Sequence, residues 1–552
     1  MDDLNRNCVL LFDEMSLSSG FHYKAHKQTI TGFEDLDHLG RSSQAANHAL
    51  VFMARGVRKA WKQVVAYYLT CDTIPSIHLK NIIIKVIDAL QKIGLKVVAT
   101  VCVQGPTNQG ALRQLCFNNR EKPTSYHFVV NNQSVCTIYD VPHLLKNTRH
   151  ALLRCEIQFE PGKVAKFEYI EKAFHLDKQK RAYSLLPKLN QSHFNFSDSF
   201  LKMKVKVAAA QLSHSMTAAI EIFVSSGDLP AEAIYTAEFV ETIDKLLDSL
   251  NGFGFDSSKE FYRALSENSP HLAFWSNMLV QLSQWKLITR DAGKDVTKQY
   301  AFIEGWQITI RSIIDIWNRL KQEGFKYLSL RSVNQDPLEN LFGLVRQRGV
   351  RNTNPTCHQF IAALKTSVVN NLSNISTNDN CENDNCSPLS NLTSFLEGCY
   401  DNPQNLDVID YKEFVPESTS NIEDNQATAY VTGYLLHKIV IPDCDACKKT
   451  FLSGEVTNKH IFVNFKEHGN ATTNLIYASE KAITTLDQIH NRLYEYLEYC
   501  GHLQQIENKF KELNKELFNS LINTCSEHNT AESFINNCIR LTIYKYVREK
   551  KV

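Results

Sequence analysis

The chain has 552 residues, of which 43% are hydrophobic and 22% charged, and its formal net charge is +1. This length is too great for one hydrophobic core and predicts two or three domains, while the ordinary composition excludes a fibrous or wholly disordered protein. The near-zero net charge also excludes a generally basic surface as an argument for nucleic-acid binding, so that argument has to rest on local patches.

The sequence carries no clear signal for secretion or membrane insertion. The longest apolar runs, such as 82–84 and 97–103, are far too short to span a bilayer. The N-terminus is acidic and lacks the basic-then-apolar order of a signal peptide. Fifteen cysteines are scattered without a tight framework, which in a long intracellular chain indicates mostly reduced core thiols. We therefore expect a soluble intracellular protein that does not act at a membrane.

The first 150 residues have the pattern of a mixed sheet. Short apolar or alternating runs predict strands at 8–12, 49–54, 63–69, 96–102 and 135–139, and 21–33 is predicted to be a hairpin partner of the first strand. A helix is predicted to begin at Ser76 and to end just before Gly94. The order is three strands, a helix, a strand and a further strand. Acidic residues follow the first and the last of these strands, at Asp13 and Asp140.

Beyond residue 152 the pattern becomes mainly helical. Helices are predicted at 200–223, 231–250, 270–285 and 302–323, and another begins at 336. The block 152–331 is long enough to form a domain of its own. Residues 370–391 are rich in Asn, Ser and Asp and predict a disordered linker. An apolar stretch at 430–441 and a long helix through Leu486 and Leu497 then predict a helical C-terminal region.

Four motifs occur in a fixed order along the chain. They are 11–16 (Leu-Phe-Asp-Glu-Met-Ser), 48–56 with 61–63, 139–147 (Tyr-Asp-Val-Pro-His-Leu-Leu-Lys-Asn) and 334–343 (Asn-Gln-Asp-Pro-Leu-Glu-Asn-Leu-Phe-Gly). In this order they resemble the motifs of P element and THAP-domain DNA transposases, and 430–434 shows a weaker likeness. A set of four ordered motifs is much more specific than any one of them.

The resemblance implies an α/β fold, in which an RNase H-like mixed sheet is split by a mainly α-helical insertion domain and followed by a helical C-terminal region. The implied boundaries are 1–151 and 332–369 for the two parts of the core, 152–331 for a GTP-binding insertion, 370–425 for a disordered linker and 426–552 for the C-terminal region. The chain starts only twelve residues before Asp13, without the family's zinc-dependent, DNA-binding THAP domain and coiled coil. We therefore expect either a fragment or a protein that has lost this DNA-binding domain.

The chemistry implied by the family is two-metal phosphoryl transfer, in which carboxylates converge on two divalent ions. The resemblance assigns Asp13, Asp336 and Glu339 to catalysis, with Mg²⁺ or Mn²⁺ held by Asp13 and Glu339. Taken alone, Asp13 is more simply a solvent-facing acid at a strand end. Taken alone, 336–339 is better explained as a capping box, with Asp336 as N-cap, Pro337 at the first helical position and Glu339 reaching back. The two roles do not exclude each other.

The second acid of the family's triad is missing. The family has Cys-Asp-Gln-Gly after its fourth strand, whereas this chain has Cys102-Val103-Gln104-Gly105. Valine cannot ligate Mg²⁺, which requires oxygen ligands. Asp140 at the next strand end is a candidate replacement, although the family has an acid there as well. We therefore expect an impaired catalytic site.

The insertion is implied to bind GTP. The sequence contains no Gly-rich phosphate loop followed by Lys and Ser or Thr, which excludes an ordinary P-loop GTPase. Likeness to the family at 202–211 and 239–251 transfers nucleotide binding to Lys204, Val205, Asp248 and Asn251. A lysine can neutralise phosphate, and an aspartate can accept two hydrogen bonds from guanine. Without the family, a basic solvated helix face and a helix C-terminus explain the same residues better.

Two further groups of side chains stand out. Arg346, Arg348 and Arg351 form a basic run after Glu339 that could contact a DNA backbone, although surface arginines on helices are common. Cys444 and Cys447 form a C-x-x-C pair, with His437 and His468 nearby in sequence. No second pair at the usual spacing completes four zinc ligands, so two reduced thiols are the favoured interpretation.

The leading hypothesis is a P element-like transposase or transposase-derived protein that acts in the nucleus. It would cleave and transfer DNA strands at transposon ends with guanine nucleotide assisting assembly, and a second copy of the chain is a candidate partner. Val103 leaves open whether the chain is an active enzyme. The rival hypotheses are a domesticated, non-catalytic nuclear scaffold that binds DNA or protein, and a decaying genomic copy.

Overall fold

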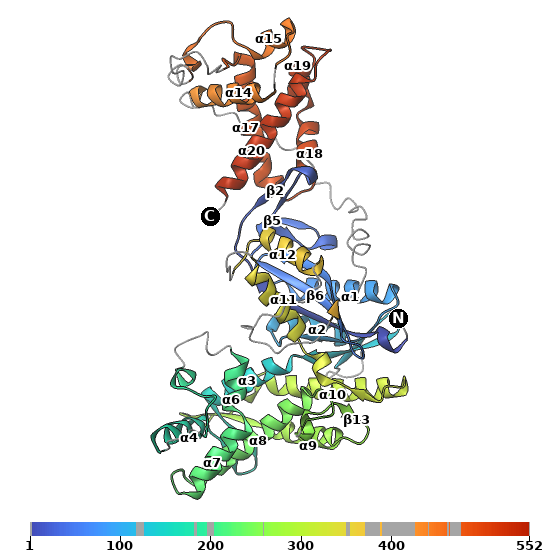
Figure 1. Cartoon of the computed structure of the whole chain (residues 1–552), viewed down its shortest axis with the longest axis vertical. Helices are drawn as coiled ribbons and strands as arrows, with labels where there is room; N and C mark the ends of the chain where they lie inside the picture. The colour runs from blue at the N-terminus through green and yellow to red at the C-terminus, as the bar shows by residue number, and fades with distance from the viewer. Residues whose placement is uncertain are drawn as a thin grey trace.

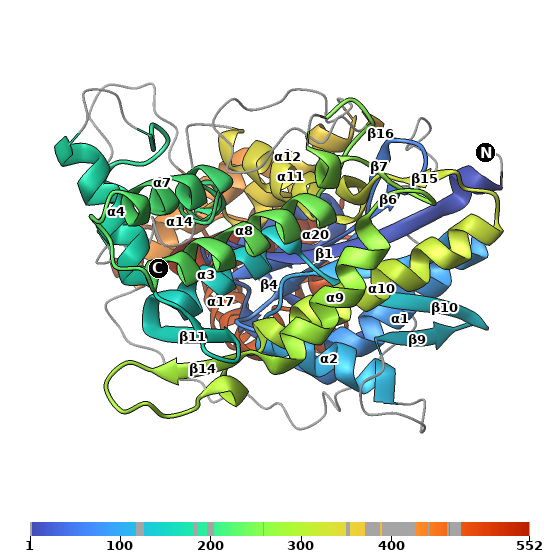
Figure 2. The ribbon, with the colours of Figure 1, turned by 90° about the horizontal axis from the view of Figure 1, so that it is seen from below.

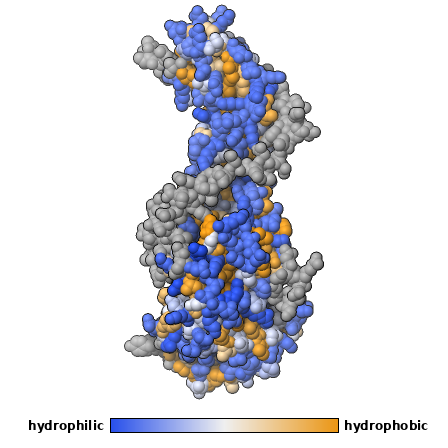
Figure 3. Space-filling view, turned by 90° about the vertical axis from the view of Figure 1, so that its right-hand side faces the viewer, coloured by the Kyte–Doolittle hydropathy of each residue, from blue (hydrophilic) through white to orange (hydrophobic). Residues whose placement is uncertain are grey.

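The computed structural model describes residues 3–117, 126–180, 185–195, 204–257, 259–348, 354–369, 387–388, 425–439, 441–460, 463 and 476–550. The molecule is elongated, with a central sheet, a mainly helical block at one end and the C-terminal helices at the other (Figure 1). The visible face in Figure 3 is largely hydrophilic, and its hydrophobic side chains are spread over several small areas.

A mixed sheet forms the centre of the molecule. Its middle strands are β7 (Trp61–Thr70), β6 (His48–Gly56), β1 (Asn7–Ser16), β8 (Lys96–Cys102) and β10 (Gln133–Tyr139), hydrogen-bonded in this order. The edges are formed by β4 (Phe33–Asp35) and β5 (Arg41–Ala45) on one side, by β9 (His127–Val130) on the other, and β16 (Ser387–Pro388) also pairs with β7. The pairings of β1 with β8 and of β8 with β10 are parallel, so these three strands end at the same edge.

The predicted strands and first helix of this part are confirmed, but the antiparallel partner of β1 is β6, and the segment 22–31, expected to pair with the first strand, forms a hairpin of its own. Cys8, Val9, Leu10, Leu11 and Phe12 are all 0% exposed, because helices cover both faces of the sheet. On one face lie α1 (Ser76–Lys92) and α2 (Pro106–Phe117), and on the other lie α11 (Asp336–Gln347) and α12 (Cys357–Val369) (Figure 2). The sequence pattern did not indicate α2 or the short strands β4, β5 and β9.

The helical block begins directly after β10. Its helices are α3 (Val141–Arg154), α4 (Phe167–Lys180), α6 (Val205–Gln211), α7 (His214–Ser225), α8 (Ala233–Leu250), α9 (His271–Gln284) and α10 (Phe302–Gln322). A small sheet of β12 (Lys163–Ala165), β11 (Cys155–Glu160) and β14 (Lys286–Thr289) accompanies them. The long helix α10 packs along β10, which attaches the block to the central sheet.

One predicted helix of this block is divided in two. The prediction at 200–223 corresponds to α6 and α7, because the Ser213 hydroxyl accepts a hydrogen bond from the Met216 amide and starts a new helix. The segment Val205–Ser225 is long and apolar enough by composition to cross a membrane. Half of that window (50%) is buried inside the protein, as expected for helices in a packed core.

The C-terminal helices form a second core. They are α14 (Asn425–Ile439), α15 (Asp445–Phe451), α17 (Glu480–Cys500), α18 (Ile506–Leu513), α19 (Lys515–Ile522) and α20 (Thr530–Glu549). The predicted apolar stretch at 430–441 lies mostly in α14, and the predicted helix through Leu486 and Leu497 is α17. The predicted linker 370–425 lies outside the described residues, except for 387–388 and the first residue of α14.

A hairpin from the N-terminal part enters this second core. Strands β2 (His22–Lys24) and β3 (Thr29–Thr31) pair with each other and follow β1 in the sequence. Tyr23 and Ile30 on the hairpin are buried in the same cluster as the C-terminal helices. The amide of Ile506 donates to the carbonyl of Gln28 over 3.2 Å. We refer to the C-terminal helices 425–550 as the head, and the hairpin joins the head to the sheet.

Candidate active site

Three strand ends meet at one edge of the central sheet. Leu11 of β1 is paired with Val101 of β8, and Tyr139 of β10 is paired with Cys102. Extending both registers past the last paired residues brings Val103 beside Asp13 on one side and beside Asp140 on the other. Because neighbouring strands of a sheet point aligned side chains to the same face, the three residues share one site at the edge.

Asp140 holds this edge together. Its side chain is 1% exposed and caps α3, with Oδ2 accepting from the His143 amide over 3.2 Å. Its Oδ1 accepts from the backbone amide of Gln335 over 3.0 Å. A buried carboxylate with these two bonds ties the start of the insertion to the segment just before α11. Burial raises the pKa of Asp140, and the nearby charge of Glu339 adds to this increase.

Gln335 docks α11 onto the strand ends. Its side-chain amide donates to the carbonyl of Phe12 over 2.8 Å and to that of Val101 over 3.4 Å. These carbonyls belong to β1 and β8, so the helix start is fixed relative to both strands. Glu339, one turn into α11, then reaches His143, with 3.1 Å between Oε1 and Nε2. Lys146 Nζ lies 3.2 Å from the same histidine nitrogen.

The electrostatics of the site favour a bound cation. Burial, together with the charges of Glu339 and Asp140, raises the pKa of Asp13 to about 7, while His143 opposes the increase. Ligand atoms of Asp140, His143 and Glu339 all lie within 4.8 Å of one another. Carboxylates gathered in a partly buried site repel one another, and a divalent ion would remove that repulsion.

The donor set fits such an ion, but only in part. Asp13, Asp140 and Glu339 offer carboxylate oxygens, which are the ligands preferred by Mg²⁺ and Mn²⁺. His143 adds a nitrogen that suits Mn²⁺ better than Mg²⁺. Val103, at the centre of the three strand ends, offers no ligand atom. The residues can therefore surround one ion, whereas the side facing Val103 is apolar.

The predicted capping box at the start of α11 is wrong. The N-cap is Gln335, and Asp336 is the first helical residue without a capping hydrogen bond. Asp336 is 8% exposed, accepts from Asn334 over 2.8 Å and lies 3.7 Å from Arg331. Burial, followed by the charge of Asp140, raises its pKa to about 7. Glu339 faces His143, with 3.1 Å between Oε1 and Nε2, and Asp336 is held beside Arg331.

The residues expected to bind nucleotide lie on two helices. Lys204 is the N-cap of α6 and Val205 is its first residue, and α6 packs on α3. Asp248 lies near the end of α8, where Lys259 binds its carboxylate over 2.5 Å. Burial raises the pKa of Asp248, an effect that Lys259 opposes. Asn251 is the C-cap of α8, and its Oδ1 accepts from Asn334 over 3.2 Å, next to the carboxylate site.

Two sequence features look different in the structure. Arg346 and Arg348 are exposed at the end of α11, while Arg351 lies outside the described residues. No second ligand pair accompanies Cys444 and Cys447 at the usual sequence spacing, but two such side chains from 81 residues further along the chain lie beside them. His468 lies outside the described residues.

Several residues of the site were not singled out from the sequence. His143 and Lys146 lie within a quoted motif, but nothing in that motif alone distinguishes a residue facing the acids from one facing the core. Nothing in the sequence distinguishes Gln335, since glutamine side chains occur at many helix starts. Arg55 donates to Asn334 over 3.0 Å and is 4% exposed, a placement that only the tertiary structure reveals.

Known proteins show the same combination of parts. Family models for the TNP-like RNase H N-terminal domain, GTP-binding insertion domain and RNase H C-terminal domain match residues 1–116, 142–263 and 332–365. The Transposable element P transposase of Drosophila melanogaster is 28% identical over 457 residues, covering 80% of this chain. The chain spans 57% of that relative's length. The solved Drosophila P element transposase strand transfer complex matches with a TM-score of 0.57 at 24% identity, covering 67% of this chain and 78% of that one.

These matches and the geometry together define the class of protein, which is an RNase H-like core interrupted by a GTP-binding-type insertion. Within that class, the chain carries the TNP-like domains and is similar to the P element-type transposases. The expected family and fold class are thereby confirmed.

Proposed function

We propose that this chain acts on DNA as a P element-like transposase or transposase-derived protein whose strand-cleaving site is impaired by Val103. The observation that carries the proposal is the approach of Glu339 to the strand-end acids, although 196 residues separate it from His143, its partner. The proposed domain division remains that of the sequence, with the core in 1–151 and 332–369 and the insertion in 152–331.

The carboxylates would have distinct tasks in this proposal. When bound, Mg²⁺ or Mn²⁺ would supply charge stabilisation at the attacking and leaving oxygens of a phosphodiester. Asp13 is held rigidly within β1, two residues past the last pairing of β1 with β8, and α11 aims Glu339 at the same place. Asp140 ties the start of α3 to the start of α11 through its bonds to the backbone amides of His143 and Gln335. His143 orients the carboxylate of Glu339 and would move aside or join the ligand set.

Asp336 has a supporting task in the proposal rather than a metal-binding one. Its carboxylate lies against Asn334 and Arg331 and is nearly fully buried. We infer that it positions the segment before α11, because Asn334 in turn contacts Arg55 of β6 and Asn251 of the insertion. A shift of the insertion would therefore reach the segment that carries Glu339.

The partners follow from the same surfaces. DNA, including transposon ends, would run past the strand ends, where the exposed Arg346 and Arg348 can pair with phosphates. GTP would bind the insertion through Lys204, Val205, Asp248 and Asn251. Asp248 is available to guanine only if Lys259 releases it, so we propose that nucleotide competes with this ion pair. Action on DNA implies a nuclear location, and assembly with a second copy is part of the proposal.

One observation favours the rival function of a non-catalytic DNA- or protein-binding scaffold. Val103 stands at the position of the second acid, so the ligand set is one carboxylate short. A protein of this kind would keep the fold and the partner surfaces without cutting DNA.

A plasmid-nicking assay separates the two functions. The full chain is incubated with supercoiled plasmid carrying candidate end sequences, in Mg²⁺ or Mn²⁺, with and without GTP. We expect weak nicking by the parent, a clear gain in Val103→Asp, and none in the double variant Val103→Asp with Asp13→Asn. If Val103→Asp binds the ion and DNA but leaves the plasmid intact, the scaffold is the better conclusion.

A further inference from the structure

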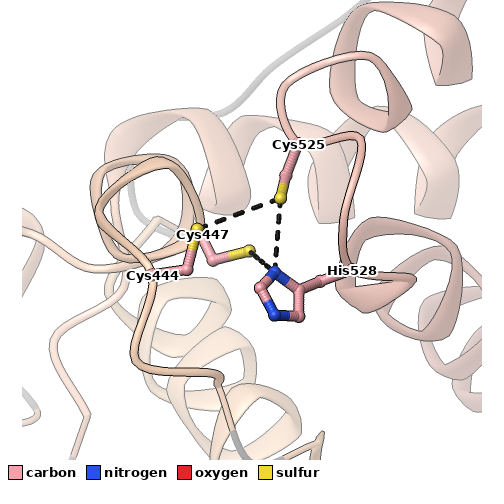
Figure 4. Close-up of side chains that lie close together, drawn as sticks. All are labelled: Cys444, Cys447, Cys525 and His528. Carbon is pink, nitrogen blue, oxygen red and sulfur yellow. Dashed lines mark hydrogen bonds between the residues drawn. The ribbon is translucent and has the colours of Figure 1, made fainter.

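Four potential zinc ligands converge in the head. They come from two short segments that lie 81 residues apart in the sequence. The members of this cysteine–histidine cluster are Cys444, Cys447, Cys525 and His528 (Figure 4). Their ligand atoms all lie within 4.8 Å of one another. The cluster is far in sequence from the carboxylates of the active site and shares no residue with them.

The spacing of the ligand atoms fits a tetrahedral ion. Zn–S bonds of about 2.3 Å and Zn–N bonds of about 2.0–2.1 Å place two sulfurs about 3.8 Å apart, and sulfur and nitrogen about 3.6 Å apart. Cys444 and Cys525 have their sulfurs 3.9 Å apart. His528 Nδ1 lies 3.4 Å from the sulfur of Cys525 and 3.9 Å from that of Cys447. A disulfide would require sulfurs about 2.05 Å apart, and all three cysteines are free.

The local structure explains why these side chains point inward. Cys444 is the N-cap of α15 and Cys447 lies one turn later, so both sulfurs face the same side of the helix start. Cys525 and His528 lie in the short connection between α19 and α20. Each pair has two residues between its members, so the sequence pattern is C-x-x-C followed by C-x-x-H. Cys447 is 1% exposed and the other three are half-buried, which leaves an entry path for an ion.

We propose that the cysteine–histidine cluster binds one structural Zn²⁺ ion. Three thiolates and one imidazole fill a tetrahedral site completely and leave no open position for a substrate, which is typical of structural rather than catalytic zinc. Zinc is favoured over Mg²⁺ or Ca²⁺ because the ligands are soft sulfur and nitrogen atoms. The ion belongs to the fold of the head and is independent of the metal proposed at Asp13 and Glu339.

The ion would cross-link two parts of the head that already pack against each other. It would connect the start of α15 to the corner between α19 and α20, next to the ring contact of Phe451 with Phe534 at 5.5 Å. Helices α15 and α19 are short, with 7 and 8 residues, and such helices are marginal without tertiary support. Since zinc ligands are disordered relative to one another in an unfolded chain, zinc binding would stabilise the head directly.

Zinc content of the purified full chain tests the proposal. Protein prepared with reductant and without chelator is measured by plasma mass spectrometry and by native mass spectrometry. We expect a single zinc ion per chain in the parent and in Cys71→Ser, a matched control at a half-buried cysteine just after β7. We expect the loss of most of this zinc in Cys525→Ser and in His528→Ala. His528→Cys should retain it, because a thiolate can replace the imidazole.

Cobalt substitution of the parent requires no variant and so avoids the problem of a variant that fails to fold. The Co²⁺ protein should show the intense visible bands of tetrahedral thiolate coordination, and His528→Cys should change these bands while keeping the ion. Zinc undiminished in the Cys525→Ser and His528→Ala double variant would overturn the proposal. So would a folded parent that contains no zinc and shows no cobalt bands, or a disulfide within the cluster in protein purified under reducing conditions.

Discussion

Replacing Val103 with aspartate tests the assignment of this residue to the missing acid position. The site has a valine between Asp13 and Asp140, at the ends of three adjacent strands. Without metal, Val103→Asp adds a carboxylate next to Asp13, whose pKa is already raised to about 7. The variant should therefore be less stable than the parent in chelator. With Mg²⁺ the new carboxylate becomes a ligand, and the order of stability should reverse.

The size of the effect follows from charge and from linkage. Two unit charges about 4 Å apart interact by about 4 kcal/mol at an effective dielectric constant of about 20, and a divalent ion doubles this before solvation costs. We therefore expect Val103→Asp to lower the dissociation constant of Mg²⁺ by about 100-fold, which corresponds to about 2.7 kcal/mol of binding free energy. At a Mg²⁺ concentration about 100 times the dissociation constant of the variant, binding stabilises the folded variant by about 2.7 kcal/mol. The same concentration is about one times the dissociation constant of the parent and stabilises the parent by about 0.4 kcal/mol. For a domain of this size the difference corresponds to a Tm increase of about 5–10 °C.

Differential scanning fluorimetry over a Mg²⁺ titration measures this difference. Val103→Asn serves as the matched control, because it adds an oxygen of similar size without the charge. We expect a large Mg²⁺-dependent increase in Tm for the aspartate variant only, and its loss when Asp13→Asn is added. The reasoning is refuted if the parent already responds as strongly as Val103→Asp, or if the aspartate variant shows no response although it remains folded.

Three further predictions concern other parts of the site. Calorimetry should show GTP bound in preference to ATP, and Asp248→Ala should remove that preference; equal binding of both nucleotides by the parent contradicts the assignment. Gln335→Ala leaves the buried carbonyls of Phe12 and Val101 without their donor and should lower the free energy of unfolding of the core by about 1–3 kcal/mol. Denaturation monitored by hydrogen exchange in β1 measures this loss, with Gln335→Glu as a second variant that restores bulk but not the donor. The pKa of Asp336 is about 7 in the folded protein, against 3.8 in the unfolded chain. Between these pH values the folded state binds one more proton than the unfolded state. The free energy of unfolding of the metal-free protein should therefore fall as pH rises from about 4 to 7. Asp336→Asn should remove up to about 4 kcal/mol of this fall, and identical pH profiles of Tm would contradict it.

Much of the sheet could be predicted from the sequence because its signal is local. Five consecutive buried residues in β1 and a run of β-branched residues in β8 are typical of strands covered on both faces. The interpretation of 336–339 failed for the opposite reason. A capping box is a local pattern, and here a distant residue, Asp140, binds the amide of Gln335.

The cysteine–histidine cluster could not be predicted either, because its two halves lie far apart in the sequence. Cys444 and Cys447 were visible as a pair, and Cys525 and His528 have the same spacing, but 81 residues separate the two pairs. The usual spacing between zinc-ligand pairs is far shorter, so the sequence alone gave no reason to join them. Only the packing of α15 against the corner between α19 and α20 brings them together.

The insertion has a consequence for the time at which the site can form in a cell. Asp140 leaves the ribosome 195 residues before Gln335, the partner of its Oδ1. At a synthesis rate of about 5–20 residues per second, this carboxylate waits roughly 10–40 s for that partner. If the insertion folds as a unit during this interval, its two ends are already close when α11 emerges, and little chain entropy remains to be lost. Slow or failed folding of the insertion would instead leave three strand ends exposed on a growing chain, where unpaired acids and apolar edges invite misassembly.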